Sequence, residues 1–144
     1  MPGIVTPRET GEIQIRTDQV MDRYLNRPEA TAAAFTADGW LRTGDLGRLD
    51  ERGYVFIVDR LNDTIVSGAE NVYPLEIEHV LDAHDAVREA AVVGAPSERW
   101  GETPVAYLIG ASTDPAARPS VEGLAAWCRA HLAGYKCPSR FVWV

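Results

Sequence analysis

Basic residues are scarce in this sequence, and lysine is almost missing. The 144 residues include 14 lysines and arginines against 21 aspartates and glutamates, so the formal net charge is −7 at pH 7. Lys136 is the only lysine, and the arginines are scattered along the chain. Nucleic-acid-binding domains are more often basic or gather their basic residues on one face. The composition therefore argues against a nucleic-acid partner, and an anionic ligand would have to be held by local groups.

Long apolar segments are also missing. No hydrophobic run approaches the roughly 20 residues that a transmembrane helix needs. The first residues, MPGIVTPRETG, lack the basic start and following apolar stretch of a secretion signal. The remaining composition, 46% hydrophobic and 24% charged, is ordinary for a globular domain. We expect a cytoplasmic protein with no transmembrane segment.

Cysteine and histidine are few, and their spacing matches no metal site. Cys128 and Cys137 fit no common zinc or redox pattern and are expected to be reduced thiols. His79 and His84 are five residues apart on an expected helix, so they do not share a face as ligands four apart would. His131 has no partner cluster. We predict no metal site built from these residues.

The first 60 residues predict β structure with one short helix. Residues 11–16, GEIQIR, alternate apolar and polar side chains, as a half-buried strand does. Residues 27–35 predict a helix with proline and glutamate in its first turn. Residues 40–49 and 54–58 flank a polar turn and predict a hairpin. This part shows no obvious core of its own.

The remaining residues predict the order strand, helix, strand, strand, helix. Pro74 opens the first helix and Ser120 caps the second, and each helix has an apolar stripe at helical spacing. The predicted strands are 64–66, 91–93 and 105–109, with a turn at 67–71 and a surface loop at 111–119; the stripes are Ile77, Val80, Leu81 and His84, and Val121, Leu124, Ala125 and Cys128. The expected fold is α+β, with a three-stranded sheet packed by helices.

Two local patterns contain groups that bind nucleotides. In RTGDL, the carboxylate of Asp45 follows a glycine and can accept two hydrogen bonds from a ribose diol. In DRLND, Arg60 stands at a strand end, where a guanidinium can hold a phosphate or a ribose. Taken alone, the first also fits an ordinary Asx turn, and the second a surface ion pair.

Two further patterns suggest a close approach of ligand to backbone and a stacking surface. In SGAENVYP, Gly68 and Ala69 leave room beside the main chain, although a tight turn before a helix has the same composition. Trp100 in ERWGE and Tyr135 in YKCP are large aromatic residues in polar, loop-like segments. Such rings stack well on a purine, or they can lie over the small core instead.

Together, these patterns resemble the adenylate-forming superfamily of acyl-CoA synthetases, peptide-synthetase adenylation domains and luciferases. The resemblance covers nearly the whole chain: it starts at GEIQIR, runs through YLNRPEAT, DGWLRTGDLG, GYVFIVDR and SGAENVYPLEIE, and reaches RWGE and GYKCPSRF. The segment SGAENVYPLEIE is similar to the acyl- and aryl-CoA synthetase branch. Peptide-synthetase domains usually carry a basic RIEL-like run there.

The resemblance implies two half-reactions that use ATP, CoA and Mg²⁺. A carboxylic acid, here expected to be a fatty acid, attacks the α-phosphate of ATP and gives an acyl-adenylate and pyrophosphate. The CoA thiol then attacks that anhydride. A small C-terminal domain turns on a hinge between the two steps and presents different faces to one site. By this resemblance, residues 1–60 are the C-terminal tail of the large domain, and residues 61–144 are the mobile domain.

The resemblance also implies roles for single residues. Asp45 and Arg60 would bind the nucleotide, and Asn62 would stand at the hinge, where the family usually has Asp or Lys. The residues implied on the CoA side are Ser67, Gly68 and Ala69 along the pantetheine, Trp100 and Tyr135 beside the adenine, and Lys136 at a phosphate. Some relatives carry basic residues where this chain has Cys137 and Ser139, so Arg140 is a further candidate for the phosphate.

Other parts of the family's site are expected outside this chain. The phosphate-binding loop, the acyl pocket and most Mg²⁺ contacts belong to the large domain before Gly11, and the catalytic lysine follows Val144. Lys136 is not that lysine, because its YKCP context belongs to the CoA side. We therefore expect no catalytic residue in this chain.

Three interpretations remain open from the sequence. The first is part of an acyl-CoA synthetase whose isolated chain is inactive. The second is a non-catalytic module that binds CoA or a partner protein, and the third is a fragment of a peptide-synthetase adenylation domain. Under the second interpretation, the β elements before Arg60 lack sheet partners and leave open edges, so the purified chain is expected to associate with itself.

Overall fold

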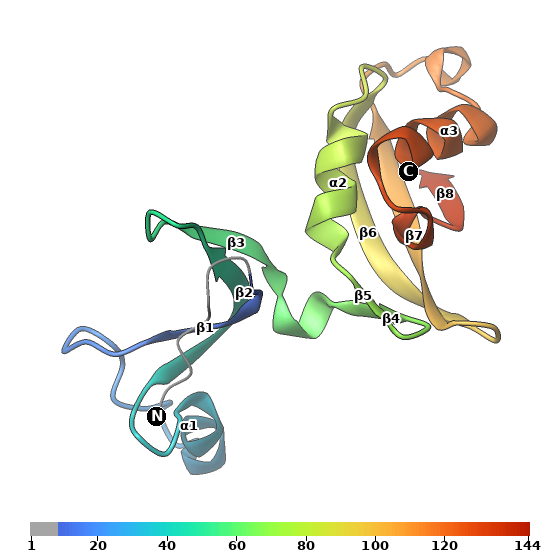
Figure 1. Ribbon diagram of the computed structural model, residues 1–144. Helices are drawn as coiled ribbons and strands as arrows, with labels where there is room; N and C mark the ends of the chain where they lie inside the picture. Colours follow the sequence, from blue (N-terminus) through green and yellow to red (C-terminus); the bar gives the residue numbers. More distant parts are fainter. Residues whose placement is uncertain (1–8) are drawn as a thin grey trace. The chain divides into compact units, whose positions relative to one another are not determined.

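The computed structural model describes residues 9–144, which form two compact units that meet between Asn62 and Asp63 (Figure 1). The α+β class expected from the sequence is confirmed. None of the helices in the described part of the chain is long and apolar enough to cross a bilayer.

The first unit is a three-stranded antiparallel sheet with one helix. The strand order is β1-β2-β3, and a bulge interrupts the pairing of β2 with each neighbour. The turn between β2 and β3 is held by the carboxylate of Asp50, which accepts hydrogen bonds from the backbone N–H groups of Arg52 and Tyr54. The elements are β1 (Gly11–Ile15), α1 (Pro28–Ala34), β2 (Leu41–Leu49), β3 (Val55–Arg60) and the 3-10 turn η1 (Leu61–Asp63).

The core of this first unit is thin. Leu46 is the only hydrophobic residue of its described part that is buried. Four consecutive apolar residues, from Tyr54 through Ile57, are about half exposed on β3 and the turn before it. The unit therefore gains little of the apolar burial that stabilises an independent domain.

The second unit contains a five-stranded sheet, where the sequence predicts three strands. The order is β5-β4-β7-β6, and β8 pairs in parallel with the later half of β7. The strands are β4 (Ile65–Ser67), β5 (Glu70–Val72), β6 (Val87–Ser97), β7 (Gly101–Gly110) and β8 (Arg140–Trp143). The prediction missed β5 because its polar residues Glu70 and Asn71 fall within the predicted turn 67–71, and it shortened β6 because a glycine and a proline interrupt its apolar residues.

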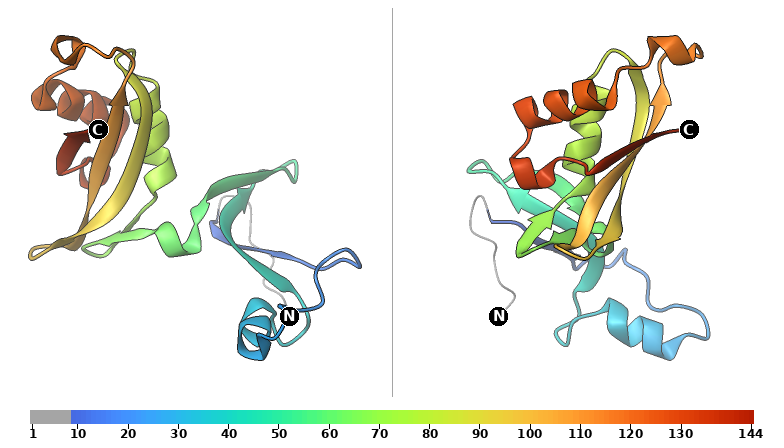
Figure 2. Two further views of the ribbon diagram at one scale, coloured as in Figure 1. Left: turned by 180° about the vertical axis from the view of Figure 1, so that it is seen from behind. Right: turned by 90° about the vertical axis from the view of Figure 1, so that its right-hand side faces the viewer.

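Two helices cover one face of this sheet (Figure 2). They are α2 (Pro74–Asp82) and α3 (Val121–His131), with short 3-10 turns η2 (Pro115–Ala117) and η3 (Gly134–Lys136) near α3. The hydroxyl of Ser120 accepts a hydrogen bond from the backbone N–H of Gly123, as the sequence predicts for a helix cap. The core between helices and sheet is fully apolar: Ile65, Val72, Ile77, Leu81, Val87, Ala90, Val92, Ala106, Leu108, Leu124, Cys128, Leu132 and Phe141.

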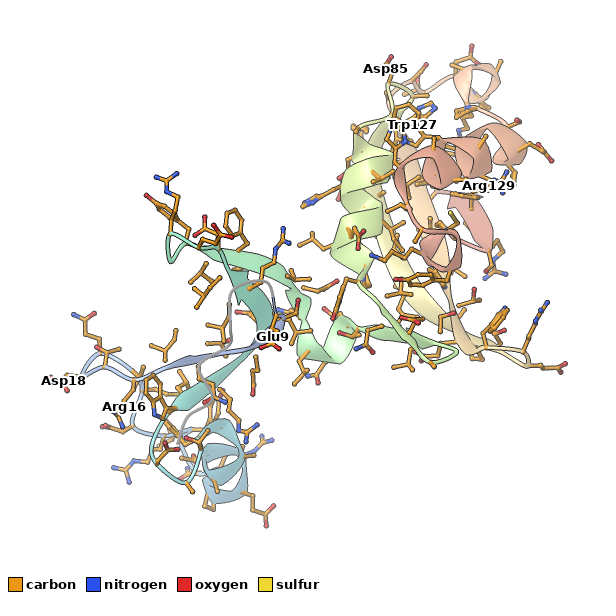
Figure 3. All side chains as sticks on the ribbon, in the orientation of Figure 1. Glu9, Arg16, Asp18, Asp85, Trp127 and Arg129 are labelled. Atoms are coloured by element: carbon orange, nitrogen blue, oxygen red, sulfur yellow. The ribbon has the colours of Figure 1, made fainter. Side chains whose placement is uncertain are left out.

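Two members of the predicted apolar stripes are placed differently. His84 lies beyond the end of α2, where its ring makes an edge contact with Trp127 at 5.1 Å between centroids. Figure 3 shows Trp127 at the end of the unit that also carries Asp85. Val121 is 52% exposed, because the first residue of a helix lies at the margin of the buried face.

Candidate functional site

The two residues expected to bind nucleotide are paired in the first unit. Asp45 on β2 is directly opposite Arg60 on β3 in the strand register. The Arg60 Nε lies 3.5 Å from the Asp45 Oδ1. The guanidinium side chain is 74% exposed and the carboxylate side chain 31% exposed, so both groups can still meet a ligand. The hairpin thus brings together two polar groups that are 15 positions apart in the sequence.

The backbone beside Asp45 is fixed by Thr43. The Thr43 hydroxyl accepts a hydrogen bond from the Asp45 N–H and donates one to the carbonyl of Ile13 on the neighbouring strand. This contact was not foreseen from the sequence, although a threonine two residues before an aspartate is a usual turn signal. These two hydrogen bonds fix the backbone of β2 at the position that carries the Asp45 carboxylate.

Asn62, the predicted hinge residue, is the last residue of the first unit and lies in η1. The sequence puts the boundary between residues 60 and 61, two positions earlier. Its role as a hinge stays a prediction.

The residues expected on the CoA side come from three separate turns of the second unit. Gly68, in the turn between β4 and β5, donates a backbone hydrogen bond of 2.7 Å to the carbonyl of Trp100, in the turn between β6 and β7. A Cβ atom at Gly68 would lie 3.3 Å from the Trp100 ring. Ser67 is buried beside this contact and Ala69 is exposed. The indole of Trp100 thus lies against the glycine turn and is itself 48% exposed.

Arg99 is a neighbour of this contact that sequence reasoning missed. Its guanidinium carbon lies 4.6 Å from the centre of the Trp100 ring, a cation–π distance. The adjacent Arg-Trp pair in ERWGE was the available signal.

The third turn, η3, carries Tyr135 and Lys136 and packs against β5. Tyr135 is 46% exposed. Lys136 does not extend freely into solvent: its ammonium donates hydrogen bonds of 2.8 and 2.6 Å to the two carboxylate oxygens of Glu76 on α2. No local pattern indicates Glu76 as its partner, because the two residues are 60 positions apart.

Just after η3 lie Cys137 and Ser139, where some relatives carry basic residues, and Arg140, the further candidate for the phosphate. The Ser139 hydroxyl donates to the carbonyl of Pro104 at 3.2 Å, and the Cys137 thiol lies 3.8 Å from the carbonyl of Ala133. Arg140 is exposed at the start of β8. Of the three, only Arg140 presents a charged group to solvent.

Neither thiol is suited to act as a nucleophile. Cys128 is fully buried, and this burial raises its pKa to about 11. Burial also raises the pKa of Cys137. Thiolate is the reactive form, so both groups are unreactive near neutral pH. Among residues 9–144, no group of three His, Cys, Asp or Glu side chains lies together in a way that could hold a metal ion.

An open pocket of about 350 Å³ lies elsewhere in the second unit. Asp85, Gly110 and Arg118 are among the residues that line it. It contains none of the residues predicted for nucleotide or CoA. The candidate site is therefore a set of exposed turns that would meet a large ligand, and not this pocket.

Comparison with known proteins shows what this chain is similar to. Residues 76–144 match the family model of the AMP-binding enzyme C-terminal domain. The chain is 50% identical over 141 residues to 2-succinylbenzoate–CoA ligase of Bacillus pumilus, which covers 98% of this chain and 28% of that protein. It is 43% identical over 140 residues to the long-chain-fatty-acid–CoA ligase FadD13 of Mycobacterium tuberculosis, covering 97% of this chain and 27% of that protein.

Solved structures show the same similarity. The o-succinylbenzoate CoA synthetase of Bacillus subtilis, in complex with its acyl-adenylate intermediate OSB-AMP, superposes with a TM-score of 0.88 at 44% identity, over 96% of this chain and 28% of that chain. The amide bond synthetase McbA of Marinactinospora thermotolerans gives a TM-score of 0.89 at 40% identity, over 99% of this chain and 28% of that chain. This chain therefore spans less than a third of the length of these relatives. It belongs to the adenylate-forming superfamily that includes the acyl- and aryl-CoA ligases, and it corresponds to their C-terminal portion.

Proposed function

We propose that this chain is the C-terminal part of an ATP-dependent ligase that joins a carboxylic acid to CoA. The observation that carries the proposal is the contact between two turns distant in sequence, in which Gly68 of the β4–β5 turn lies against Trp100 of the β6–β7 turn. A further turn, η3, packs against β5 and carries Tyr135, and the rings of Trp100 and Tyr135 are both about half exposed. A nucleotide-bearing thiol such as CoA needs both a stacking surface and a close path along a backbone.

On the nucleotide side, Asp45 and Arg60 would act as a pair. The carboxylate would accept hydrogen bonds from the ribose hydroxyls, and the guanidinium would meet a phosphate or the ribose. Because the two groups lie 3.5 Å apart, they would contact the same nucleotide from neighbouring strands.

On the CoA side, the glycine turn and the tryptophan would form one wall. The absence of a side chain at Gly68 leaves space for the pantetheine beside the main chain, and Ser67 and Ala69 flank that path. Trp100 and Tyr135 are about half exposed, and their rings would stack on the adenine. Phosphates of CoA would meet an exposed arginine, for which Arg140 at the start of β8 is the candidate.

The chemistry requires binding and orientation from this chain, but no nucleophile. A carboxylate oxygen of the acid attacks the α-phosphorus of ATP and pyrophosphate leaves. The CoA sulfur then attacks the acyl carbon and AMP leaves. Movement about Asn62 would exchange the face presented in each step. Magnesium, when bound, would offset the phosphate charge, but residues 9–144 offer no carboxylate cluster for it.

The acid is proposed to be a fatty or an aryl acid. The relatives named above include ligases of both kinds. A peptide-synthetase role is disfavoured by the ENVYP run at the start of α2. The similarity to an amide bond synthetase makes an amine a second candidate for the acyl acceptor. Binding of CoA to this chain distinguishes the two acceptors, since an amine-using enzyme has no need of a CoA site.

The test is a calorimetric titration of this chain with CoA and, separately, with ATP. We expect weak binding of CoA that is lost in Trp100→Ala, and no measurable binding of ATP, because the phosphate-binding loop is expected outside this chain. Tyr54→Ala is the matched control, since Tyr54 is a similarly exposed aromatic residue of the other unit. CoA binding that survives Trp100→Ala would contradict the proposed site.

A non-catalytic role as a partner-binding module is the alternative, and the exposed apolar residues of β3 favour it. The two roles separate when the chain is mixed with a relative's large domain, ATP, CoA and an acid. Formation of acyl-CoA supports the ligase. Complex formation without product supports the module, and the chain alone is expected to be inactive in both cases.

A further inference from the structure

The single lysine of the chain is engaged with a carboxylate of another element. Both oxygens of Glu76 accept hydrogen bonds from the Lys136 ammonium, at 2.6 and 2.8 Å. The lysine side chain is only 18% exposed, whereas the glutamate side chain is 42% exposed. The pair connects the first turn of α2 to η3, across 60 positions of sequence.

The setting of Glu76 favours this pair. Glu76 is the third residue of α2, where the partial positive charge of the helix N-terminus stabilises an acid. An ammonium has three N–H donors, and two of those of Lys136 point at the carboxylate. A phosphate that bound the Lys136 ammonium would also come close to the Glu76 carboxylate, and the two negative charges would repel each other.

The turn that carries Tyr135 is held mainly by contacts outside itself: it packs against β5, Cys137 packs against the core, and the N–H of Ser139 donates to the carbonyl of Pro104 at 2.9 Å, besides the ion pair of Lys136 with Glu76. Its backbone bonds are two, from the N–H of Lys136 to the carbonyl of Ala133 at 2.9 Å and from the N–H of Cys137 to the carbonyl of Gly134 at 3.3 Å. A 3-10 turn of three residues depends on such tertiary anchors, because its own hydrogen bonds have poor geometry. The lysine ammonium also lies 5.8 Å from the centre of the Tyr135 ring.

We propose that Lys136 is a positioning residue: through Glu76 it fixes η3 against α2 and so holds the ring of Tyr135 in place, instead of binding a phosphate of CoA directly. The proposal rests on the proposed function for its effect on CoA, but the pair's control of η3 does not depend on any ligand. It replaces the direct phosphate contact that the family resemblance implies for Lys136.

The variant Glu76→Gln separates the two roles by the sign of its effect. If Lys136 binds phosphate directly, removal of the competing carboxylate leaves CoA binding unchanged or makes it tighter. If Lys136 acts through Glu76, loss of the charged hydrogen bonds loosens η3, and we expect the CoA dissociation constant to rise about three- to tenfold.

The charge-reversed pair supplies the rescue. In the double variant Glu76→Lys with Lys136→Glu, the ion pair can form again with its partners exchanged. We expect CoA affinity to return to within about threefold of the original chain, whereas Lys136→Met alone stays weak. A direct phosphate contact predicts the reverse order, because the double variant places a carboxylate where the phosphate would bind. Gly134→Ala is the matched control in η3, since a Cβ there meets nothing within 4 Å.

Amide hydrogen exchange of the ligand-free chain tests the proposal even if CoA does not bind. We expect faster exchange at the N–H groups of Lys136 and Cys137 in Glu76→Gln and in Lys136→Met, and restored protection in the charge-reversed pair, with an unchanged urea midpoint for the second unit. Unchanged exchange at these amides would overturn the proposal. A general loss of stability without local change would overturn it too, because the pair would then only support the fold. Absence of CoA binding with the expected exchange pattern would count against the proposed function alone.

Discussion

Among single residues, Gly68 is sterically constrained and also belongs to the candidate CoA site. Its φ is +66°, a left-handed conformation that residues with a Cβ adopt at an energetic cost. Its missing side chain faces the ring of Trp100 at 3.3 Å. Backbone geometry and the placement of the indole therefore depend on the same position.

We expect Gly68→Ala to shift Trp100 as well as to destabilise the second unit. The left-handed backbone alone costs about 1–2 kcal/mol for an alanine. Gly53→Ala is the control, since Gly53 has a φ of +82° and a Cβ there would meet nothing within 4 Å. Each variant should lower the urea midpoint of its own unit, but only Gly68→Ala should move the indole N–H resonance of Trp100. Equal shifts in both variants would refute the contact.

The buried thiol of Cys128 is expected to make the chain less stable at high pH. Burial raises its pKa from 9.0 to about 11, so between these values the unfolded chain releases the thiol proton while the folded chain keeps it. Stability from this group is thus complete below pH 9 and decreases as pH rises towards 11, by roughly 2–3 kcal/mol in total. We expect unfolding free energies measured in urea from pH 8 to 10.5 to decrease more steeply for the original chain than for Cys128→Ala. Parallel pH profiles would show that the thiol is not protected by burial.

At the level of elements, α2 closes one edge of the second sheet. β6 is the last strand in the order β5-β4-β7-β6, so alternate N–H groups along it point away from β7. Two carboxylates of α2 accept from these groups: Glu78 from the N–H of Val92 and Asp82 from the N–H of Ala90, each at 2.8 Å. The helix thereby satisfies donors that an open edge would leave to water or to another chain.

Removal of both acceptors should weaken the contact between helix and strand. In Glu78→Ala with Asp82→Ala, the N–H groups of two buried residues lose their partners, which costs about 1–3 kcal/mol for each group. Glu78→Gln with Asp82→Asn keeps an acceptor oxygen at both places and should lose much less. Urea unfolding and amide exchange at Ala90 and Val92 measure the difference. Similar losses in the two double variants would mean that charge, and not the acceptor, is what the strand requires.

At the level of the whole molecule, apolar burial is distributed unevenly. All residues of the hydrophobic core cluster belong to the second unit. The described part of the first unit buries Leu46 and leaves Val55 and Ile57, which share a strand face, 57% and 62% exposed. We therefore expect the first unit to have the lower stability and the greater tendency to associate.

Self-association should depend on that exposed face of β3. We expect the chain to form dimers or larger species at high concentration, and Val55→Thr with Ile57→Thr to reduce them. Val66→Thr is the control, because Val66 is 50% exposed on a strand of the second unit. Sedimentation velocity over a concentration series gives the measurement. A monomer at every concentration, or an equal effect of Val66→Thr, would refute the role of β3.

Much of the fold follows from local sequence patterns. The hairpin around Asp50 and the helices opened by Pro74 and capped by Ser120 lie where turn and cap residues predict them. The strand that the patterns missed, β5, is short, and the expected strand at residues 141–144 is confirmed as β8, whose parallel pairing with β7 no local pattern indicates. For a strand as short as β5, pairing with a neighbour decides the conformation, and local propensity does not.

The sequence by itself determined the family, the order of the elements and the residue types of the candidate site, because these depend on local spacing and composition. Only the tertiary structure decided which groups meet. It pairs Asp45 with Arg60 across a hairpin, sets Trp100 against Gly68, and joins Lys136 to Glu76 across 60 positions of sequence. These contacts arise from strand register and helix packing, which fix the distance between residues that no local pattern connects.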